Sequence, residues 1–483
     1  MLIYGRRMGM SRTALTFAAL TLFLLAIALV RPLSVDESQY VAATSLVGQG
    51  LLPYRDFAYL QTPLQPLLFG PLQWLFASHL LVAMRIVNAL LGAATVMLVY
   101  GAARRVGATE RAALAAAAIL VTCESFAWGV GVARNDMLPA ALMMTGLFVI
   151  AKGQTGPRMF GAGVALGLAA GVKVSYAVPA AAIFPALLWA RGARSLWFVA
   201  GVAAGLLPSL ILIALAPHAF LAEAIIFPAI APAQYYAEIG KGWRLGPGRF
   251  LQLLEAAAIG PALIAAVEVV RCHWKNTRYW FGDPIRGVML AAAFGGLVSA
   301  GLNKPFQIFY LLPALPPLFV LVALLFSNGD ARPHWLQAVW ALFFVAGLVP
   351  VAGWFLRAAS DGMPVLNAER RSKALGAALR AQRVEGPIAT LAGQYVERID
   401  PRFAAGPFLY RTHGFISAEQ ADQWHIVTRD RGEGLAEAPP AAIVTGVYPD
   451  AQPELEDELA TKARAAGHRP TANAAGFTIW LRL

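Results

Sequence analysis

The stretch Ser34-Val-Asp36-Glu37-Ser-Gln-Tyr40 decides how this chain can fold and where its chemistry can lie. Two adjacent carboxylates, Asp36 and Glu37, directly follow an apolar run at 13–31 that is long enough to cross a bilayer. Acidic groups next to a membrane are costly unless they are solvated, paired or used in function. The sequence therefore predicts a first transmembrane helix that ends in an acidic loop.

The composition places the chain in the membrane class. Of its 483 residues, 58% are hydrophobic and 14% are charged, whereas a soluble domain carries roughly a quarter charged residues. The net charge of +12 fits basic loops held against anionic lipid, and no nucleic-acid-binding motif accompanies it. Cys123 and Cys272 are expected at different depths, so no disulfide framework is predicted.

Apolar windows predict about eleven transmembrane helices. Arg31-Pro32 follows the first window where a secretion signal would carry small residues, so we interpret this window as a retained helix. The predicted spans lie near 13–31, 80–103, 111–129, 136–152, 159–175, 177–190, 196–215, 250–270, 286–302, 308–326 and 335–356.

Basic residues in short loops predict the orientation of these spans. Those predicted to be cytoplasmic are Arg6, Arg7, Arg12, Arg104, Arg105, Arg111, Lys152, Arg158, Arg191, Arg194, Arg271, Lys275, Arg278, Arg286 and Arg332. The intervening segments, including 32–79, 130–135 and 303–307, are then predicted to face outward. An odd number of spans places the tail on the same outward side.

From about residue 357 polar residues become frequent and apolar runs shorten to strand length. Helices are predicted at 367–383 and 453–466, and strands at 387–392, 441–447 and 477–483. We therefore divide the chain into a transmembrane domain, 1–356, and a small α/β domain, 357–483. The tail carries no recognisable catalytic motif, so we expect it to support the chemistry rather than perform it.

Glu37 has a structural interpretation beside a catalytic one. Ser34-x-x-Glu37 fits a capping box, in which the Glu side chain accepts the backbone N–H of Ser34, and Gln can fill the same position. Asp36 is explained less well, because a cap does not need a second acid. Asp36 and Tyr40 lie four residues apart, on one face of the predicted helix.

The later segment Arg134-Asn-Asp136 places a base and an acid at the same surface. On spacing alone Asp136 is interpreted as an N-cap in a local ion pair. Arg85 and Lys173 lie within or at the end of apolar runs, where a charge is costly. Pairing of these cations with Glu124, which also lies in such a run, is the structural alternative to a role in binding.

These motifs resemble the C-type glycosyltransferase superfamily, in the bacterial branch related to protein mannosyltransferases and lipid A aminoarabinose transferases. The resemblance spans about 13–355. It rests on the Asp-Glu pair, Gly50…Tyr54-x-Asp56, Gln61-x-Pro63-Leu64, Ala83-Met-Arg85-Ile…Asn88-Ala-Leu-Leu-Gly92, Arg134-Asn-Asp136 and Lys304-Pro-Phe…Phe309-Tyr310.

The resemblance implies roles for single residues. The essential carboxylate of the first outward loop maps onto Asp36, with Glu37 beside it, and the acid of the second onto Asp136. The segment 304–316 resembles the loop whose basic and aromatic residues face the donor phosphate. The candidate catalytic residues are thus Asp36, Glu37 and Asp136, and the candidate substrate-binding residues are Tyr40, Arg55, Gln61, Arg85, Arg134, Lys173, Lys304 and Tyr310.

One departure from the family concerns cofactors. The aminoarabinose transferases carry a Glu-Lys-Pro-Pro type sequence where this chain has Gln61-Thr62-Pro63-Leu64. Gln61 and Thr62 cannot supply the charges of that Glu and Lys. No cofactor is therefore assigned, and the sequence does not decide whether a divalent metal binds beside the carboxylates.

The expected fold is a polytopic α-helical membrane protein with a small C-terminal α/β periplasmic domain. The resemblance implies an inverting hexosyl- or pentosyltransferase of the bacterial inner membrane. The basic residues in the loops predict that its N-terminus lies in the cytoplasm. It would move a sugar from a polyprenyl-phosphate donor to a lipid, glycan or protein acceptor of the cell envelope, among membrane lipids. The alternatives are a transporter or flippase for lipid-linked sugars, and an inactive scaffold whose tail binds an envelope partner.

Overall fold

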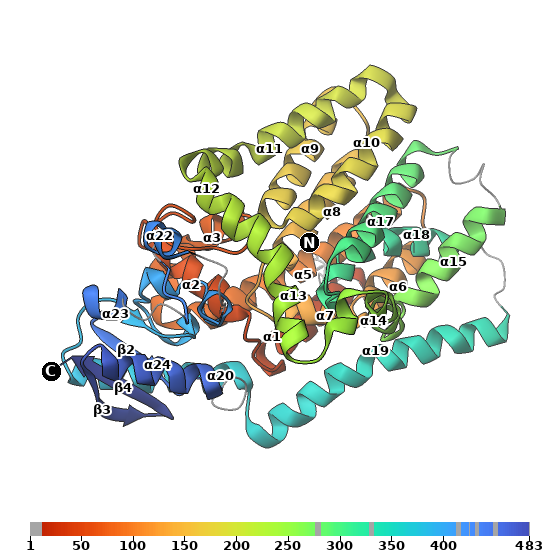
Figure 1. Ribbon diagram of the computed structural model, residues 1–483. Coiled ribbons are helices and arrows are strands. Elements are labelled where there is room, and N and C mark those ends of the chain that lie inside the picture. The colour runs from red at the N-terminus through yellow and green to blue at the C-terminus, as the bar shows by residue number, and fades with distance from the viewer. Residues whose placement is uncertain are drawn as a thin grey trace, which may run out of the picture.

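The computed structural model is a bundle of helices with a smaller mixed tail (Figure 1). It describes residues 12–275, 282–327, 333–411, 417–424, 426–429, 434–447 and 453–482, so Arg6, Arg7, Arg278 and Arg332 lie outside the described residues. The bundle helices are α1 (Arg12–Val30), α5 (Leu80–Arg105), α6 (Glu110–Leu120), α7 (Glu124–Val130), α8 (Met137–Ala151), α9 (Gly156–Val172), α10 (Ala177–Arg191), α11 (Leu196–Leu215), α14 (Gly248–Ala258), α15 (Ala262–Lys275), α17 (Pro284–Leu302), α18 (Leu315–Ser327) and α19 (His334–Asp361).

Every predicted span coincides with a helix or with a bent pair of helices. The span predicted at 111–129 is α6 and α7, bent by 70°, and that at 250–270 is α14 and α15, bent by 95° around Gly260-Pro261. Among the described residues, five helices are long and apolar enough to cross a membrane, or up to seven if each bent pair is one span. The chain is a multi-pass helical protein, and the larger predicted count of about eleven, which needs shorter helices, stays a prediction.

Glycine allows α9 and α11 to pack with their backbones in contact. A Cβ added to Gly163 would lie 2.1 Å from a backbone oxygen of α11, and one added to Gly201 would lie 2.1 Å from a backbone oxygen of α9. Gly167 and Gly205 repeat this arrangement one turn further along, at 2.3 Å each. Small residues four apart are typical of closely packed membrane helices. This tight pair fixes the end of α9, where Lys173 follows.

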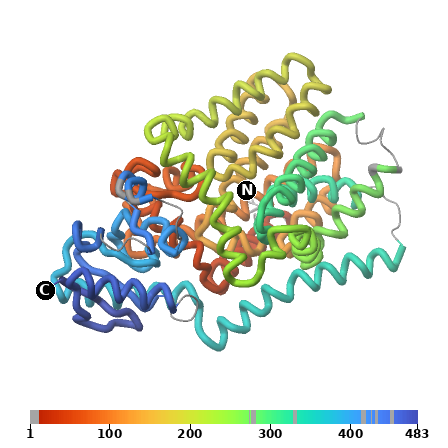
Figure 2. The backbone as a smooth tube through the Cα atoms, viewed as in Figure 1, coloured from red at the N-terminus to blue at the C-terminus, as the bar shows by residue number. Residues whose placement is uncertain are grey.

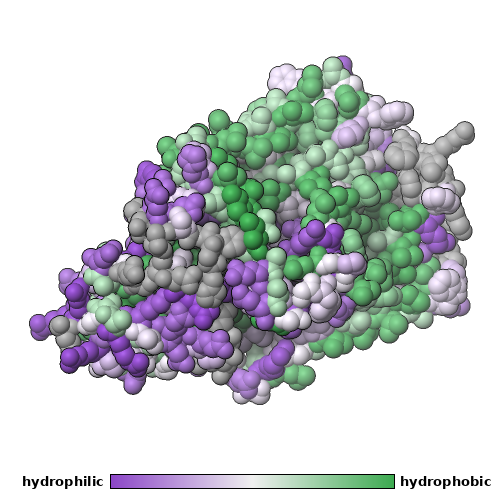
Figure 3. All heavy atoms as spheres, in the orientation of Figure 1, coloured by the Kyte–Doolittle hydropathy of each residue, from purple (hydrophilic) through white to green (hydrophobic). Residues whose placement is uncertain are grey.

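The surface of the bundle is apolar where lipid would contact it. In Figure 3 the side chains over α9–α11 and along α19 are mostly hydrophobic, whereas those over the tail are mostly hydrophilic. Leu210 and Ile211 of α11 are 52% and 54% exposed, and Leu342 of α19 is 67% exposed. Water would disfavour such a surface, and a bilayer accommodates it.

Shorter elements connect the helices and form the tail. The connecting elements are α2 (Glu37–Gly48), α3 (Leu64–Phe69), α4 (Pro71–Phe76), η1 (Ala77–His79), η2 (Val174–Tyr176), η3 (Gly192–Ser195), α12 (Pro217–Phe220), η4 (Leu221–Ile226), α13 (Phe227–Glu238), η5 (Gly242–Leu245) and η6 (Ile308–Leu311). The tail contains α20 (Pro364–Ala381), β1 (Ile388–Ala389), η7 (Gly393–Tyr395), η8 (Pro401–Phe403), α21 (Pro407–Tyr410), α22 (Ala418–Gln423), α23 (Gly434–Glu437), β2 (Ala442–Thr445), α24 (Pro453–Ala465), β3 (His468–Ala474) and β4 (Phe477–Arg482).

The tail strands form one mixed sheet in the order β1-β2-β4-β3. β1 and β2 are parallel, with Ile388 beside Ala442, and β4 runs antiparallel to both β2 and β3. The described part of the tail therefore contains the alternating helices and strands that the sequence predicts.

The tail shares a buried core with the helix that follows the acidic pair. One cluster contains Tyr40 of α2 together with Ile443 of β2 and Phe477 of β4. The hydroxyl of Ser45 in α2 donates a hydrogen bond of 3.2 Å to the backbone oxygen of Glu397. Figure 2 shows the orange-red opening segment beside the blue tail. The tail is thus placed to hold α2, and through it the acidic loop.

Candidate active site

Three connecting segments bring the charged residues together at one end of the bundle. α1 and α7 end there and α5 and α8 begin there, because successive helices run in opposite directions. The segment 31–37 reaches the segment 131–136 through hydrogen bonds. The ring of Phe309, in the segment 303–314, lies over Arg134 of the second segment. We refer to this end of the bundle as the site end.

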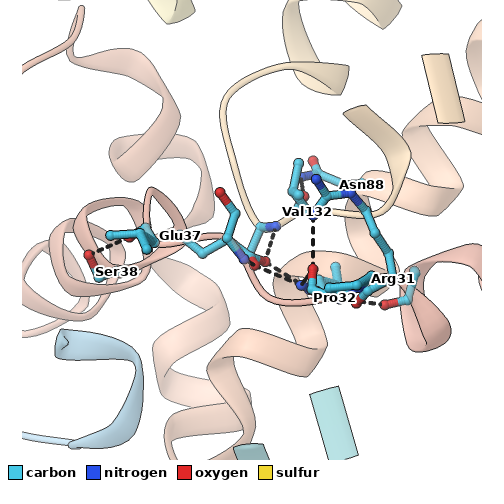
Figure 4. A network of polar contacts seen from close by, with 11 residues as sticks. Arg31, Pro32, Glu37, Ser38, Asn88 and Val132 are labelled. Atoms are coloured by element: carbon cyan, nitrogen blue, oxygen red, sulfur yellow. Dashed lines mark hydrogen bonds and ion pairs between the residues drawn. The ribbon is translucent and has the colours of Figure 1, made fainter. Parts of the chain in front are cut away.

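Glu37, which Figure 4 labels within a network of polar contacts, forms a buried, two-bond ion pair with Arg85 of α5. The Nε and Nη2 atoms of Arg85 each donate to a carboxylate oxygen of Glu37 at 2.7 Å. The backbone N–H groups of Ser34 and Ala133 donate to the same carboxylate at 2.8 and 2.7 Å. Burial would raise the pKa of the Glu37 carboxyl, but Arg85 and these hydrogen bonds outweigh burial and hold the pKa below its ordinary value.

The capping interpretation of Glu37 is confirmed only in part. The predicted bond from the Ser34 N–H is present, but α2 begins at Glu37 itself, and the main partner is an arginine from another helix. All the hydrogen bonds of this carboxylate are made within the protein core, where it is 1% exposed. The arrangement suits a structural role for Glu37 better than proton transfer.

The other two acids belong to a chain of alternating charges. Arg134 donates through Nη1 to Asp36, and its Nε lies 3.2 Å from Oδ2 of Asp136. Lys173 Nζ lies 2.5 Å from Oδ1 of Asp136. The side chain of Asp36 is 32% exposed, whereas that of Asp136 is fully buried. Asp36 is therefore the accessible end of a buried chain of charges.

Asp136 pairs with two cations and does not cap a helix. It directly precedes α8, but its side chain makes no capping hydrogen bond, so that part of the prediction is wrong. Burial would raise the pKa of its carboxyl, but Lys173 and Arg134 hold the pKa below the ordinary value. The carboxylate is already committed to the two cations and so cannot also cap the helix.

The alternative pairing through Glu124 is also wrong. Arg85 pairs with Glu37 and Lys173 pairs with Asp136, so neither cation is neutralised by Glu124. Both cations therefore lie at the site end, and their role in substrate binding stays a prediction.

Aromatic rings surround the cations of this chain. The Cζ of Arg134 lies 4.0 Å from the ring centroid of Phe309 and 5.5 Å from that of Tyr40. The Nζ of Lys173 lies 4.6 Å from the ring centroid of Phe309 and 5.3 Å from that of Tyr310. Ring faces attract cations most strongly where water is excluded. The predicted residues Tyr40 and Tyr310 thus lie in the site beside the charges.

Gln61 lies at the edge of the site. It occupies the position at which the resemblance does not decide whether a divalent metal binds. Its Oε1 accepts a long hydrogen bond, 3.4 Å, from Asn135. Among the residues that the structure describes, no group of three or more His, Cys, Asp or Glu side chains is placed to hold a metal ion.

Arg55 and Lys304 are not brought into the charged chain. Arg55 is half exposed and pairs with its neighbour Asp56 at 2.7 Å. Lys304 is exposed, and within the described ranges it forms no ion pair. Local sequence does not distinguish such surface cations from buried ones, because both follow turns near predicted span ends.

Two asparagines that we did not assign from the sequence hold the second loop in place. Asn88 donates through Nδ2 to the backbone oxygens of Val132 and Arg134 at 2.5 and 2.9 Å. Asn135 donates to the backbone oxygen of Val172 at 3.1 Å. Asn88 is a polar residue inside an apolar run, and this feature of the sequence could have marked it as a residue with a structural role.

Replacing Asp136 with Asn is expected to reduce the sugar transfer that the resemblance implies by about tenfold to a hundredfold, because Arg134 and Lys173 would lose the charge that positions them. Asn would preserve a helix cap, so a capping role predicts almost no loss. Turnover by purified protein should be compared with that of wild type at equal amounts of folded protein. Full activity in this variant would contradict the positioning role.

Comparison with known proteins agrees with this fold. The family profile of dolichyl-phosphate-mannose-protein mannosyltransferases matches residues 61–220. That range contains Arg85, Arg134, Asp136 and Lys173 and begins after Asp36 and Glu37. No curated protein matches the chain by sequence.

Solved structures share the fold over almost the whole chain. ArnT from Cupriavidus metallidurans bound to undecaprenyl phosphate superposes with a TM-score of 0.61 at 16% identity, over 97% of both chains. The oligosaccharyltransferase of Archaeoglobus fulgidus gives a TM-score of 0.53 at 11% identity, over 98% of this chain and 74% of that one. The predicted resemblance to C-type glycosyltransferases, in the branch related to protein mannosyltransferases and lipid A aminoarabinose transferases, is thereby confirmed.

Proposed function

We propose that this chain transfers a sugar from a polyprenyl-phosphate donor to a hydroxyl of a lipid, glycan or protein acceptor. The observation that carries the proposal is the difference in exposure among the three candidate acids. Glu37 and Asp136 are buried and paired with cations, whereas about a third of the Asp36 side chain is exposed. A base must reach its substrate's proton, and Asp36 satisfies that requirement.

The proposed reaction is a single displacement at the anomeric carbon of the sugar. Asp36 accepts the proton of the acceptor hydroxyl while the oxygen of that hydroxyl bonds to the anomeric carbon. The bond from that carbon to the phosphate oxygen breaks on the opposite face, which inverts the configuration, and the electron pair leaves with the lipid phosphate. The phosphate changes from a diester to a more negatively charged monoester. Arg134 and Lys173 stabilise the negative charge that develops, and the ring of Phe309 limits access of water to them.

We further propose that the site faces the periplasm of a bacterial inner membrane. α5 begins at the site end and finishes at Arg104 and Arg105, and α10 likewise finishes at Arg191. The basic loops after α5 and α10 therefore lie at the end opposite the carboxylates, and basic loops favour the cytoplasm. This topology gives residues 1–356 as the membrane domain and 357–483 as a periplasmic tail.

A reporter that fluoresces only in the cytoplasm should stay dark when it is fused to the C-terminus. It should stay dark because the proposed topology places the tail, like the site end, on the periplasmic side of the membrane. The same reporter inserted between α8 and α9 should be bright and serves as the control. A bright C-terminal fusion would place the carboxylates on the cytoplasmic side and contradict the proposed topology.

The function itself is tested with detergent-purified protein, a panel of polyprenyl-phosphate sugars and candidate acceptors. The expected result is transfer of one sugar class, followed by release of polyprenyl phosphate. A flippase needs a sealed membrane and would transfer nothing in detergent. Absence of transfer from every donor, with binding of an envelope protein by the tail, would support a scaffold instead.

A further inference from the structure

Arg31 is a buried arginine directly after α1, where we expected only the boundary of the first helix. It is 8% exposed, and among the described residues it forms no ion pair. Its Nη1 donates one hydrogen bond, 2.9 Å, to the backbone oxygen of Pro32, and its buried Nε has no partner. A guanidinium has several N–H donors, and most of those in Arg31 are unused.

The carboxylates of the site already have other partners, and Glu124, whose charge also interacts with Arg31, forms no ion pair with it in the described part of the chain. Glu37 binds Arg85, and the other two acids of the site bind Arg134. Burial lowers the pKa of Arg31 to about 9, and the Glu37 charge opposes this effect while Arg85 and Arg134 add to it. A buried charge without a partner is costly, so this position favours an anionic ligand.

Two tryptophans and a glycine shape the surroundings of this side chain. The Cζ of Arg31 lies 4.4 Å from the ring centroid of Trp128 and 5.5 Å from that of Trp354. A Cβ on Gly131 would lie 2.4 Å from the Cδ of Arg31, so a larger residue there would displace the side chain. Trp128 also contacts Arg134, whose Cζ lies 4.9 Å from its ring centroid. Arg31 is thus a second cation immediately beside the charged chain.

We propose that Arg31 binds the phosphate of the lipid carrier. The inference rests on the proposed function and adds a residue that no resemblance assigned. Trp128 contacts both Arg31 and Arg134, so these two cations can hold one anion from two sides, and the anion would reduce the repulsion between them. Because the phosphate gains charge as it leaves, Arg31 would bind the departing carrier more strongly than the intact donor.

The test measures how strongly the purified protein prefers undecaprenyl phosphate over undecaprenol, which has the same lipid chain without the phosphate. Arg31→Gln is expected to reduce this preference by about tenfold or more, since hydrogen bonds to charged groups are among the strong ones. Arg31→Lys should fall between Gln and wild type, because it retains the charge but not the planar group. If the Gln variant does not fold, the Lys variant still tests whether Arg31 contributes to the preference for the phosphate.

Two control variants separate this role from others. Arg357→Gln removes an exposed positive charge one turn beyond Trp354 in α19 and should leave the preference unchanged. Glu124→Gln removes an acid whose charge interacts with Arg31 but which lies outside the charged chain, and it should also leave the preference unchanged. An unchanged preference in both Arg31 variants would overturn this inference and leave the proposed function standing. Wild-type protein without any preference for the phosphate would overturn both.

Discussion

Replacing Asp36 with Asn is expected to reduce sugar transfer by about a hundredfold or more, the scale on which general-base catalysis operates. Asn has nearly the shape of Asp but cannot accept the acceptor proton at neutral pH. It can still accept a hydrogen bond from Arg134, so the buried part of the site should keep its arrangement. Turnover of the lipid-phosphate sugar is the measurement, with kcat and KM determined separately.

The matched control is Asp361→Asn, which changes an exposed acid at the end of α19, also at the site end. It removes the same charge without entering the site, so its turnover should match that of wild type. The expected pattern for Asp36→Asn is a large fall in kcat with little change in KM. An Asp36→Asn enzyme with wild-type turnover would remove the base from the proposed mechanism.

The helices could be predicted from the sequence because membrane-length apolar runs have few other outcomes. Each run near 80–103, 177–190 and 335–356 is a helix in the structure. The bends could not be predicted from hydropathy, which does not register Gly260-Pro261 as a break. The number of spans could not be predicted from hydropathy either, because hydropathy does not show whether a bent pair of helices crosses the membrane.

The site could be predicted as a set of residues but not as a set of pairs. Local reasoning found the bond between Ser34 and Glu37, which lie three residues apart. It missed Arg85, which is 48 residues further along the chain, because that contact depends on how α1 and α5 pack. The separation of a buried acid at Glu37 from an accessible one at Asp36 likewise follows only from the fold.

Replacing Glu37 with Gln is expected to destabilise the protein by about 3–5 kcal/mol, the usual cost of removing one partner from a buried ion pair. The capping interpretation instead predicts almost no loss of stability, because Gln can fill that position in a capping box. In the structure Gln would leave Arg85, which is 0% exposed, without its counter-charge. The free energy of unfolding should be measured in mixed micelles, beside the transfer activity of the fraction that remains folded.

The double variant Glu37→Gln/Arg85→Met distinguishes a structural role from a catalytic one. Removing both charges should cost less than the sum of the two single changes, because neither partner is left buried alone. The pKa of Glu37 is lowered from 4.5 in the folded protein, so its stabilisation is fully present above pH 4.5 and is lost as the pH falls through the folded value. The stability difference between wild type and Glu37→Gln should therefore shrink in acid. A Glu37→Gln protein as stable as wild type at neutral pH, yet without transfer activity, would identify Glu37 as the catalytic base in place of Asp36.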